Sequence, residues 1–430
     1  MTANPQEEAP AAVNNSDVYG SRSVRQRNFW FVQIDGIGVG IASSASNYLA
    51  PFLTLLKASS EQVGLLTSMS GLTGLILAIP IGRFLQSRRN VVPWYSLARL
   101  LYLASYTLTG LLPFLVSRNI LVPGILVIWA LATLPQVALN VCFTVVMNAV
   151  SGPQGRYHLM SWRWSILGLT SGVSAFIAGR LLDQMSFPVN YQIMFMVLSL
   201  GGLVSFFFSR QLTIPDNPQP EKLETEGLSR AEFRQKRMER LLDISRVILS
   251  EKPFVSFALK RFVYLFGMMF TVPLIPLYLV KTLNASNSWI GNIATAQTLV
   301  LTVGYFSWTQ ISKRSGSRLV LLLSTFSSAL YPALVASTSD LQMIMIFAAF
   351  SSIMQAGLDL TFFDELLKTV PNIESATFVA VAQTMSHFAN MAAPMVGVYV
   401  ANQIGLPGAL LIGAGIRLAG FVLFAIQKRV

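Results

Sequence analysis

Long apolar runs separated by short polar segments dominate the chain from residue 29 onward. Twelve runs approach or exceed the roughly 20 residues with which a helix crosses a bilayer. Their expected bounds are 29–56, 62–82, 91–116, 120–147, 157–182, 187–208, 254–280, 287–311, 319–337, 341–367, 375–402 and 406–427. Hydrophobic residues make up 53% of the 430 and charged residues 12%, and this charge content is about half that of a soluble domain. The pattern predicts an all-α polytopic membrane protein.

One glycine-rich stretch in the first run carries a carboxylate. Gly36, Gly38 and Gly40 follow Asp35 in the segment QIDGIGVG. A dinucleotide-binding turn needs a third glycine where Ile41 stands, and it needs a strand before it. The stretch is therefore predicted to be part of a membrane helix, whose glycines let another helix approach closely.

The net charge of +12 is distributed unevenly along the chain. If the N-terminus is cytoplasmic and the spans alternate, 22 of the 31 lysines and arginines fall in cytoplasmic segments and 3 in outside loops. This positive-inside bias predicts a plasma (inner) membrane protein with both termini in the cytoplasm. It explains the basic charge without a nucleic-acid partner. With two histidines and one cysteine, no metal site and no cofactor are expected.

The longest internal polar stretch, 210–252, divides the runs into two sets of six. We expect a disordered tail over 1–27, one six-helix half over 28–209 and another over 253–430. Ser229 and Glu232 form a capping-box pattern that predicts an amphipathic cytoplasmic helix in the linker. Similar segments recur in the two halves. Examples are Gln136 to Asn140 against Gln355 to Asp359, and 56–64 against 283–291.

Over residues 28–427 this organisation resembles the Major Facilitator Superfamily. The resemblance rests on the six-plus-six halves, the central linker and basic loops after the second and eighth spans. The family's loop residues correspond to Gly82, Arg88, Arg89, Arg314, Gly316 and Arg318, which are gating-loop candidates. Gln86 and Lys313 stand where the family pattern has an acidic residue, so the acidic part of that switch is missing.

The resemblance implies a secondary transporter that works by alternating access, with spans 1, 4, 7 and 10 lining a central cavity. Glycines of the fifth and eleventh spans resemble an antiporter motif, which slightly favours export; ordinary close helix packing is the alternative. Asp35 and Asp359 are the candidates for proton coupling, because a buried carboxylate can exchange a proton. A permanent ion pair is the alternative for Asp35. The repeat also suggests that Asp35 and Lys260 approach each other across the two halves when the cytoplasmic side is closed and separate when it opens.

Further polar residues inside the spans are substrate-cavity candidates. They are Gln136, Asn140, Arg163, Lys260, Arg261, Gln355 and His387. For the lysine and arginines the alternative is snorkelling, in which the side chain extends to the membrane surface. For the histidine the alternative is packing between helices, and for the amides it is helix–helix hydrogen bonding. Arg99 and Arg417 lie on peripheral spans and are expected to be structural. Asp364 and Glu365 are expected to contact basic residues near the gate.

The sequence therefore predicts a transporter of a small organic molecule that acts as a monomer and exchanges H⁺. Uptake of an organic anion is the alternative within transport. A receptor or assembly factor that keeps the fold without transporting is the alternative from another class. No catalytic constellation is present in the sequence, so an enzyme is not expected.

Overall fold

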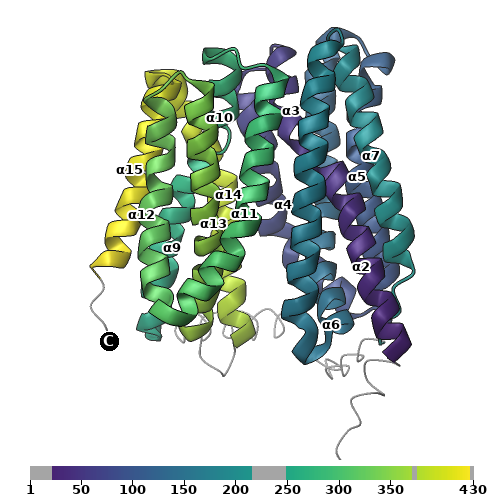
Figure 1. The fold of residues 1–430 in the computed structure, drawn as a ribbon, viewed down its shortest axis with the longest axis vertical. Helices are drawn as coiled ribbons and strands as arrows, with labels where there is room; N and C mark the ends of the chain where they lie inside the picture. The colour runs from purple at the N-terminus through teal and green to yellow at the C-terminus, as the bar shows by residue number, and fades with distance from the viewer. Residues whose placement is uncertain (1–21, 216–247, 370–374, 427–430) are drawn as a thin grey trace, which may run out of the picture.

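The computed structural model describes residues 22–215, 248–369 and 375–426, and these form helices without any strand. Figure 1 shows two bundles side by side. The first contains α2 (Arg22–Ser43), α3 (Ser46–Leu55), α4 (Ser60–Gln86), α5 (Val92–Leu115), α6 (Arg118–Gln184) and α7 (Val189–Arg210). The second contains α9 (Lys252–Thr271), α10 (Leu274–Leu277), the π-helical turn η1 (Tyr278–Thr282), α11 (Asn287–Ser315), α12 (Ser317–Ala336), α13 (Leu341–Thr369), α14 (Ser375–Ile404) and α15 (Leu406–Ala425).

The predicted spans agree with these helices. Within the described residues, nine stretches are long and apolar enough to cross a membrane, and the other three predicted spans coincide with α2–α3, α11 and α14. The first span differs from its prediction, since its helix begins at Arg22 and breaks between Ser43 and Ser46. The Ser44 hydroxyl donates to the Ile41 carbonyl oxygen at 2.6 Å, a local bond that competes with the helix pattern. The predicted linker helix lies largely outside the described residues.

The predicted fourth and fifth spans both lie within the helical element α6 and correspond to its two apolar stretches, Asn119–Ser151 and His158–Gln184. Leu121 near its start and Leu182 near its end nevertheless pack in the same apolar cluster. Val146 and Leu159, from its middle, pack in a second cluster. The two spans of α6 therefore run antiparallel, as the prediction requires.

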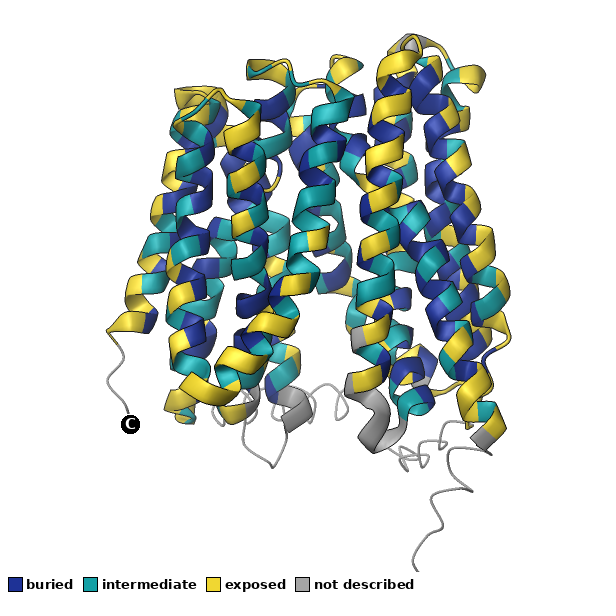
Figure 2. Ribbon diagram, viewed as in Figure 1, coloured by how far each residue is buried: buried dark blue, intermediate teal, exposed yellow. Residues whose placement is uncertain are grey.

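Apolar side chains cover the outer faces of both bundles. Exposed residues lie along the outer surfaces in Figure 2, and buried residues concentrate between the helices. Leu131 is 61% exposed and Phe207 is 61% exposed, which suits a surface in contact with lipid. The buried guanidinium of Arg417 donates to the carbonyl oxygens of Ser328 at 3.1 Å and Met268 at 3.3 Å. It thereby links α15 to α12 and α9, which agrees with a structural role.

The two bundles contact each other mainly through two helix pairs, α6 with α11 and α4 with α14, and α3 adds smaller contacts with α10, η1 and α11. In the first pair, the Thr295 hydroxyl donates to the Gly172 carbonyl oxygen at 2.8 Å. In the second pair, Gly71 lies so close to Asn390 and Met391 that an added Cβ would clash with their backbone atoms.

The cross-half hydrogen bonds and close glycine contacts lie toward one end of each helix. On α6 these contacts run from Asp183, near the end of the helix, to Gly168, which faces Thr302. On α4 they run as far as Gly74, which faces the His387 ring. The α2 helix begins and α15 ends on the opposite side of the molecule (Figure 1), which we call the terminal side. The contacting ends form the closed side.

Candidate functional site

Asp35 lies in a fully buried cluster within the first half. Its Oδ2 is 2.7 Å from Nη1 of Arg163 on α6 and 3.6 Å from Nη2 of Arg99 on α5. The Ser205 hydroxyl of α7 donates to Oδ1, and the Tyr95 hydroxyl donates to Oδ2 at 3.4 Å. Helices α2, α5, α6 and α7 thus meet around one carboxylate.

In this conformation the ion pairs of Asp35 lie within the first half. Asp35 pairs with Arg163 and Arg99 in its own half and not with Lys260. Arg163 is only 2% exposed and also donates to the Val32 carbonyl oxygen at 2.7 Å. In this conformation, then, Arg163 serves the packing of α6 against α2 rather than lining an open cavity. Gly36 faces this arginine, with its added Cβ 3.6 Å from Nη1, so the glycine leaves room for the ion pair.

Asp359 has a different environment in the second half. The Tyr305 hydroxyl of α11 donates to its Oδ2 at 2.7 Å, and Gln355 Nε2 donates to its Oδ1 at 2.8 Å. Both donors are neutral. No ion pair of Asp359 with a cation occurs among the described residues, whereas Asp35 has two.

The Asp359 side chain is exposed, and the direction it faces can be worked out from α13. Phe350, 46% exposed, lies nine residues earlier. At 3.6 residues per turn this is about two and a half turns, so the two side chains point in opposite directions. If Phe350 faces lipid, Asp359 faces the interior between the halves. A charged group is costly in lipid and commonly faces a water-filled cavity. We therefore expect Asp359 to face the space between the bundles.

The other predicted cavity residues fall into several environments. Arg261 is half-buried on α9, with a buried Nε that has no partner in the described part of the chain. His387 packs its ring on Gly74 at the inner limit of the α4–α14 contact. In the first half, Gln136 is half-buried and Asn140 is exposed. Lys260 is half-buried beside Arg261. Among these predicted cavity residues, Gln355 is the one that forms a hydrogen bond with Asp359 in the described part of the chain.

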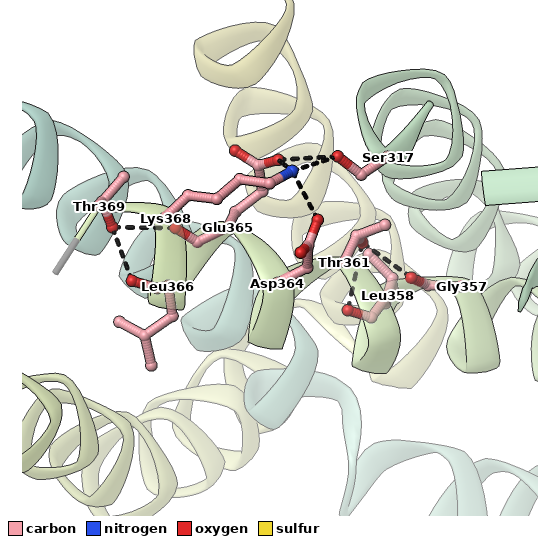
Figure 3. A network of polar contacts seen from close by, with 9 residues as sticks. All are labelled: Ser317, Gly357, Leu358, Thr361, Asp364, Glu365, Leu366, Lys368 and Thr369. Carbon is pink, nitrogen blue, oxygen red and sulfur yellow. Dashed lines mark hydrogen bonds and ion pairs between the residues drawn. The ribbon is translucent and has the colours of Figure 1, made fainter. Parts of the chain in front are cut away.

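The turn between α11 and α12 is attached to the end of α13 by the network in Figure 3. Lys368 Nζ is 2.6 Å from Asp364 Oδ2 and 3.1 Å from Glu365 Oε1, and it donates to the Ser317 hydroxyl at 2.7 Å. Burial lowers the pKa of Lys368, but the hydrogen bonds and charges of Asp364 and Glu365 outweigh it and raise the pKa. Asp364 and Glu365 do contact a basic residue, as expected, and it comes from their own helix.

The gating-loop candidates lie at these turns. Gly316 has a φ of +84°, a conformation that favours glycine. Arg314 beside it is exposed, and Arg318 is half-buried at the start of α12. In the first half, Gly82 has open space around it, and Arg88 and Arg89 are exposed.

The closed side is joined by a carboxylate that the sequence reasoning missed. Asp183, at the end of α6, accepts hydrogen bonds from the backbone N–H groups of Asn287 and Ser288 at 3.0 and 2.9 Å. It therefore caps the N-terminus of α11 from the other half. On the α4–α14 side, Asn402 donates to Glu61. The signal for Asp183 was an acidic residue directly after a span. Tyr305, also missed, gave no signal beyond being a polar residue in an apolar run.

Part of the chain matches the model of a known protein family. Residues 257–429 match the model of the Major Facilitator Superfamily. This match covers most of the second half of the chain. A search of curated proteins found no match.

Solved structures of the superfamily fold resemble the whole chain at low identity. The nucleoside transporter NupG is 11% identical, with 93% of this chain and 100% of that chain covered and a TM-score of 0.70. A D-xylose-proton symporter is also 11% identical, with 94% and 98% covered and a TM-score of 0.70. A bacterial homologue of the iron transporter ferroportin, in an inward-facing state, is 12% identical, with 94% and 98% covered and a TM-score of 0.69. The family match over residues 257–429 and the fold shared with these transporters both agree with a membrane transporter.

Proposed function

We propose that the chain is a proton-coupled secondary transporter of a small polar organic molecule, with Asp359 as the proton-binding group. The carrying observation is the contrast between the two intramembrane carboxylates. Asp35 is held by two guanidiniums in a fully buried cluster. Asp359 is exposed, and its hydrogen bonds come from the neutral Tyr305 and Gln355.

A coupling carboxylate must gain and lose its proton during each cycle. Two adjacent cations favour the charged form of Asp35 throughout, so Asp35 suits a permanent structural role. Asp359 lacks such a cation in the described residues and faces the space between the halves, where water and substrate have access. Protonation of Asp359 removes an acceptor for Tyr305 and Gln355, which frees these two side chains to bind a different group.

Transport by alternating access is supported by where the halves touch. The cross-half contacts described above occupy the closed side, and Asp359 and Arg261 lie nearer the terminal side. With the terminal side in the cytoplasm, as the charge distribution predicts, the structure faces inward. Gly168, Gly172 and Gly179 of α6 contact α11 closely, so they have a packing role. The case for export therefore rests on the motif resemblance alone. The transport assay below determines the direction of transport.

The test begins with purified protein and a thermal-stabilisation screen of sugars and nucleosides, the solutes carried by two of the structural neighbours. A ligand that binds only the folded state raises its melting temperature by mass action. A ligand found this way is then supplied to proteoliposomes with an imposed pH gradient. Accumulation against the concentration gradient is expected from the wild-type protein.

The Asp359→Asn variant is expected to lose this accumulation and to retain exchange of labelled for unlabelled ligand across the membrane. Asp340→Asn is the matched control. Its carboxylate caps α13 on the closed side, accepting from the Gln342 N–H at 2.8 Å, and it is remote from the cavity in sequence and position. Normal accumulation by Asp359→Asn would refute the assignment of Asp359. Absence of any gradient-dependent transport by wild type, with a ligand bound, would refute the proposed function.

A further inference from the structure

Trp164 is a large exposed side chain on the stretch of α6 that pairs with α11. Its exposed fraction is 48%. Val173, which is 46% exposed, lies nine residues later; this is about two and a half turns, so the two side chains point in opposite directions. Ala175, about three turns from Trp164 and on the same face, is 1% exposed. With Val173 toward lipid, we expect Trp164 to face the interior of the molecule.

The indole lies just beyond the contact between the halves. Gly168, about one turn after Trp164, faces Thr302 of α11. Tyr305, about one turn after Thr302, donates to Asp359 at 2.7 Å. Trp164 and the Tyr305–Asp359 pair therefore lie about one turn from the same cross-half contact. Both are on the terminal side of it, where α6 and α11 separate (Figure 1).

The other apolar stretch of α6 contributes two residues beside Trp164. The Phe143 ring lies 6.4 Å from the Trp164 ring at an angle of 61°, an edge-to-face contact that supports the indole. Asn140, about one turn before Phe143, is exposed. It follows Leu131, which is 61% exposed, by nine residues, so these two side chains also point in opposite directions. We therefore expect Asn140 to face the interior together with Trp164.

An indole face beside a side-chain amide is complementary to a planar nitrogen heterocycle. Every base has a π face that stacks on an aromatic side chain. An asparagine amide donates and accepts at once, which matches a ring edge that carries a donor beside an acceptor. Across the space between the halves, Tyr305 and Asp359 supply a hydroxyl and a carboxylate for the polar part of the same molecule.

We infer that Trp164 and Asn140 form the subsite that selects a planar nitrogen heterocycle as the transported solute. The ring stacks on the indole of Trp164, the amide of Asn140 binds its edge, and its hydroxylated substituent reaches toward Tyr305 and Asp359. This inference rests on the proposed function, because it names the class of solute. Its test measures binding without a proton gradient, so the two can fail independently.

The test measures binding to the purified full-length chain by calorimetry. Adenosine and uridine are the probes, and D-ribose, which lacks the base, is the comparison. We expect at least one nucleoside to bind wild type and ribose to bind far more weakly. Trp164→Leu should weaken nucleoside binding about 5- to 150-fold, the value of one base stacked on an aromatic ring. Trp164→Phe should lose less, because a ring remains.

The chain offers a matched control for Trp164 two residues away. Trp162 is 53% exposed and lies eleven residues before Val173, about three turns, so it faces lipid with Val173. Trp162→Leu should bind the nucleoside as wild type does. Asn140→Ala, at an exposed position, tests the amide separately and should weaken binding about 2- to 12-fold, the value of one hydrogen bond.

Tryptophan fluorescence gives a second readout of the stacked ring. The nucleoside should quench the emission of wild type and of Trp162→Leu, and it should leave the emission of Trp164→Leu unchanged. Failure of both nucleosides to bind wild type, ribose binding as tight as nucleoside binding, or equal losses in Trp164→Leu and Trp162→Leu would overturn the inference. Nucleoside binding that depends on Trp164, without accumulation driven by a pH gradient, would refute the proposed function and leave this subsite standing.

Discussion

The Asp183 cap makes a specific prediction about the closed side. Asp183→Ala removes the acceptor of two backbone N–H groups at the start of α11, and these two bonds cross from one half to the other. When the closed side opens, the cap must be lost anyway, because α6 and α11 separate there. The substitution therefore destabilises the closed conformation and leaves the conformation open on that side unaffected.

The size of the effect follows from the value of a helix cap. Removal of a capping side chain costs about 0.5–2 kcal/mol. With 1.4 kcal/mol corresponding to a factor of ten, the equilibrium should move toward the opened state by a factor of about 2 to 30. Asp340→Ala is the matched control. It removes a capping carboxylate on the same side of the molecule, but this carboxylate accepts from the Gln342 N–H of its own half and forms no link between the halves. It should leave the equilibrium unchanged.

The assay measures distances between spin labels on the closed side. Labels at Ser117 and Ser339, both exposed and one in each half, are introduced on a Cys142→Ser background. Asp183→Ala should increase the population with the longer distance, and Asp340→Ala should not. Identical distributions for Asp183→Ala and wild type, or equal shifts in both variants, would refute the role of Asp183 as a link between the halves.

Two further predictions concern packing inside the membrane. Asp35→Asn leaves two buried guanidiniums without their carboxylate and should cost about 3–5 kcal/mol, seen as a lowered melting temperature. Arg163→Met leaves the pair of Asp35 with Arg99 and should cost less; an equal or larger loss would contradict the cluster. Gly71→Ala places a Cβ against the backbone of Asn390 and Met391 and should lengthen the label distance by forcing α4 from α14. Gly415→Ala, which has open space around it, is its control, and matching distances in both variants would count against this contact.

The sequence predicted the helices and halves well because membrane spans depend on local composition. A run of about 20 apolar residues has few alternatives in a bilayer, and the distribution of arginines and lysines separates one side from the other. The exceptions are local. The break at Ser44 coincides with a hydrogen bond from its side chain to the Ile41 carbonyl oxygen, which an apolar pattern does not reveal.

The partners of the buried charges could not be predicted in the same way. Asp35 has candidate cations on several spans, and the choice depends on which helices cross at the same depth. The internal repeat pointed to Lys260 for the conformation closed on the cytoplasmic side, and in the present conformation packing of α2 against α5 and α6 brings Arg99 and Arg163 to the carboxylate. The Tyr305–Asp359 contact likewise joins two helices far apart in sequence. Residue type identified Asp35 and Asp359 as important positions, but only the structure distinguishes their environments.

The central claim, that Asp359 carries the coupling proton, is tested most directly without any substrate. A proton that binds one conformation more tightly than the other must shift the equilibrium between them as the pH changes. The measurement is the distance distribution of the Ser117 and Ser339 labels as a function of pH. Wild type and Asp340→Asn should show the same pH-dependent shift, and Asp359→Asn should show a distribution that does not change with pH. A pH dependence in Asp359→Asn equal to that of wild type would contradict the account.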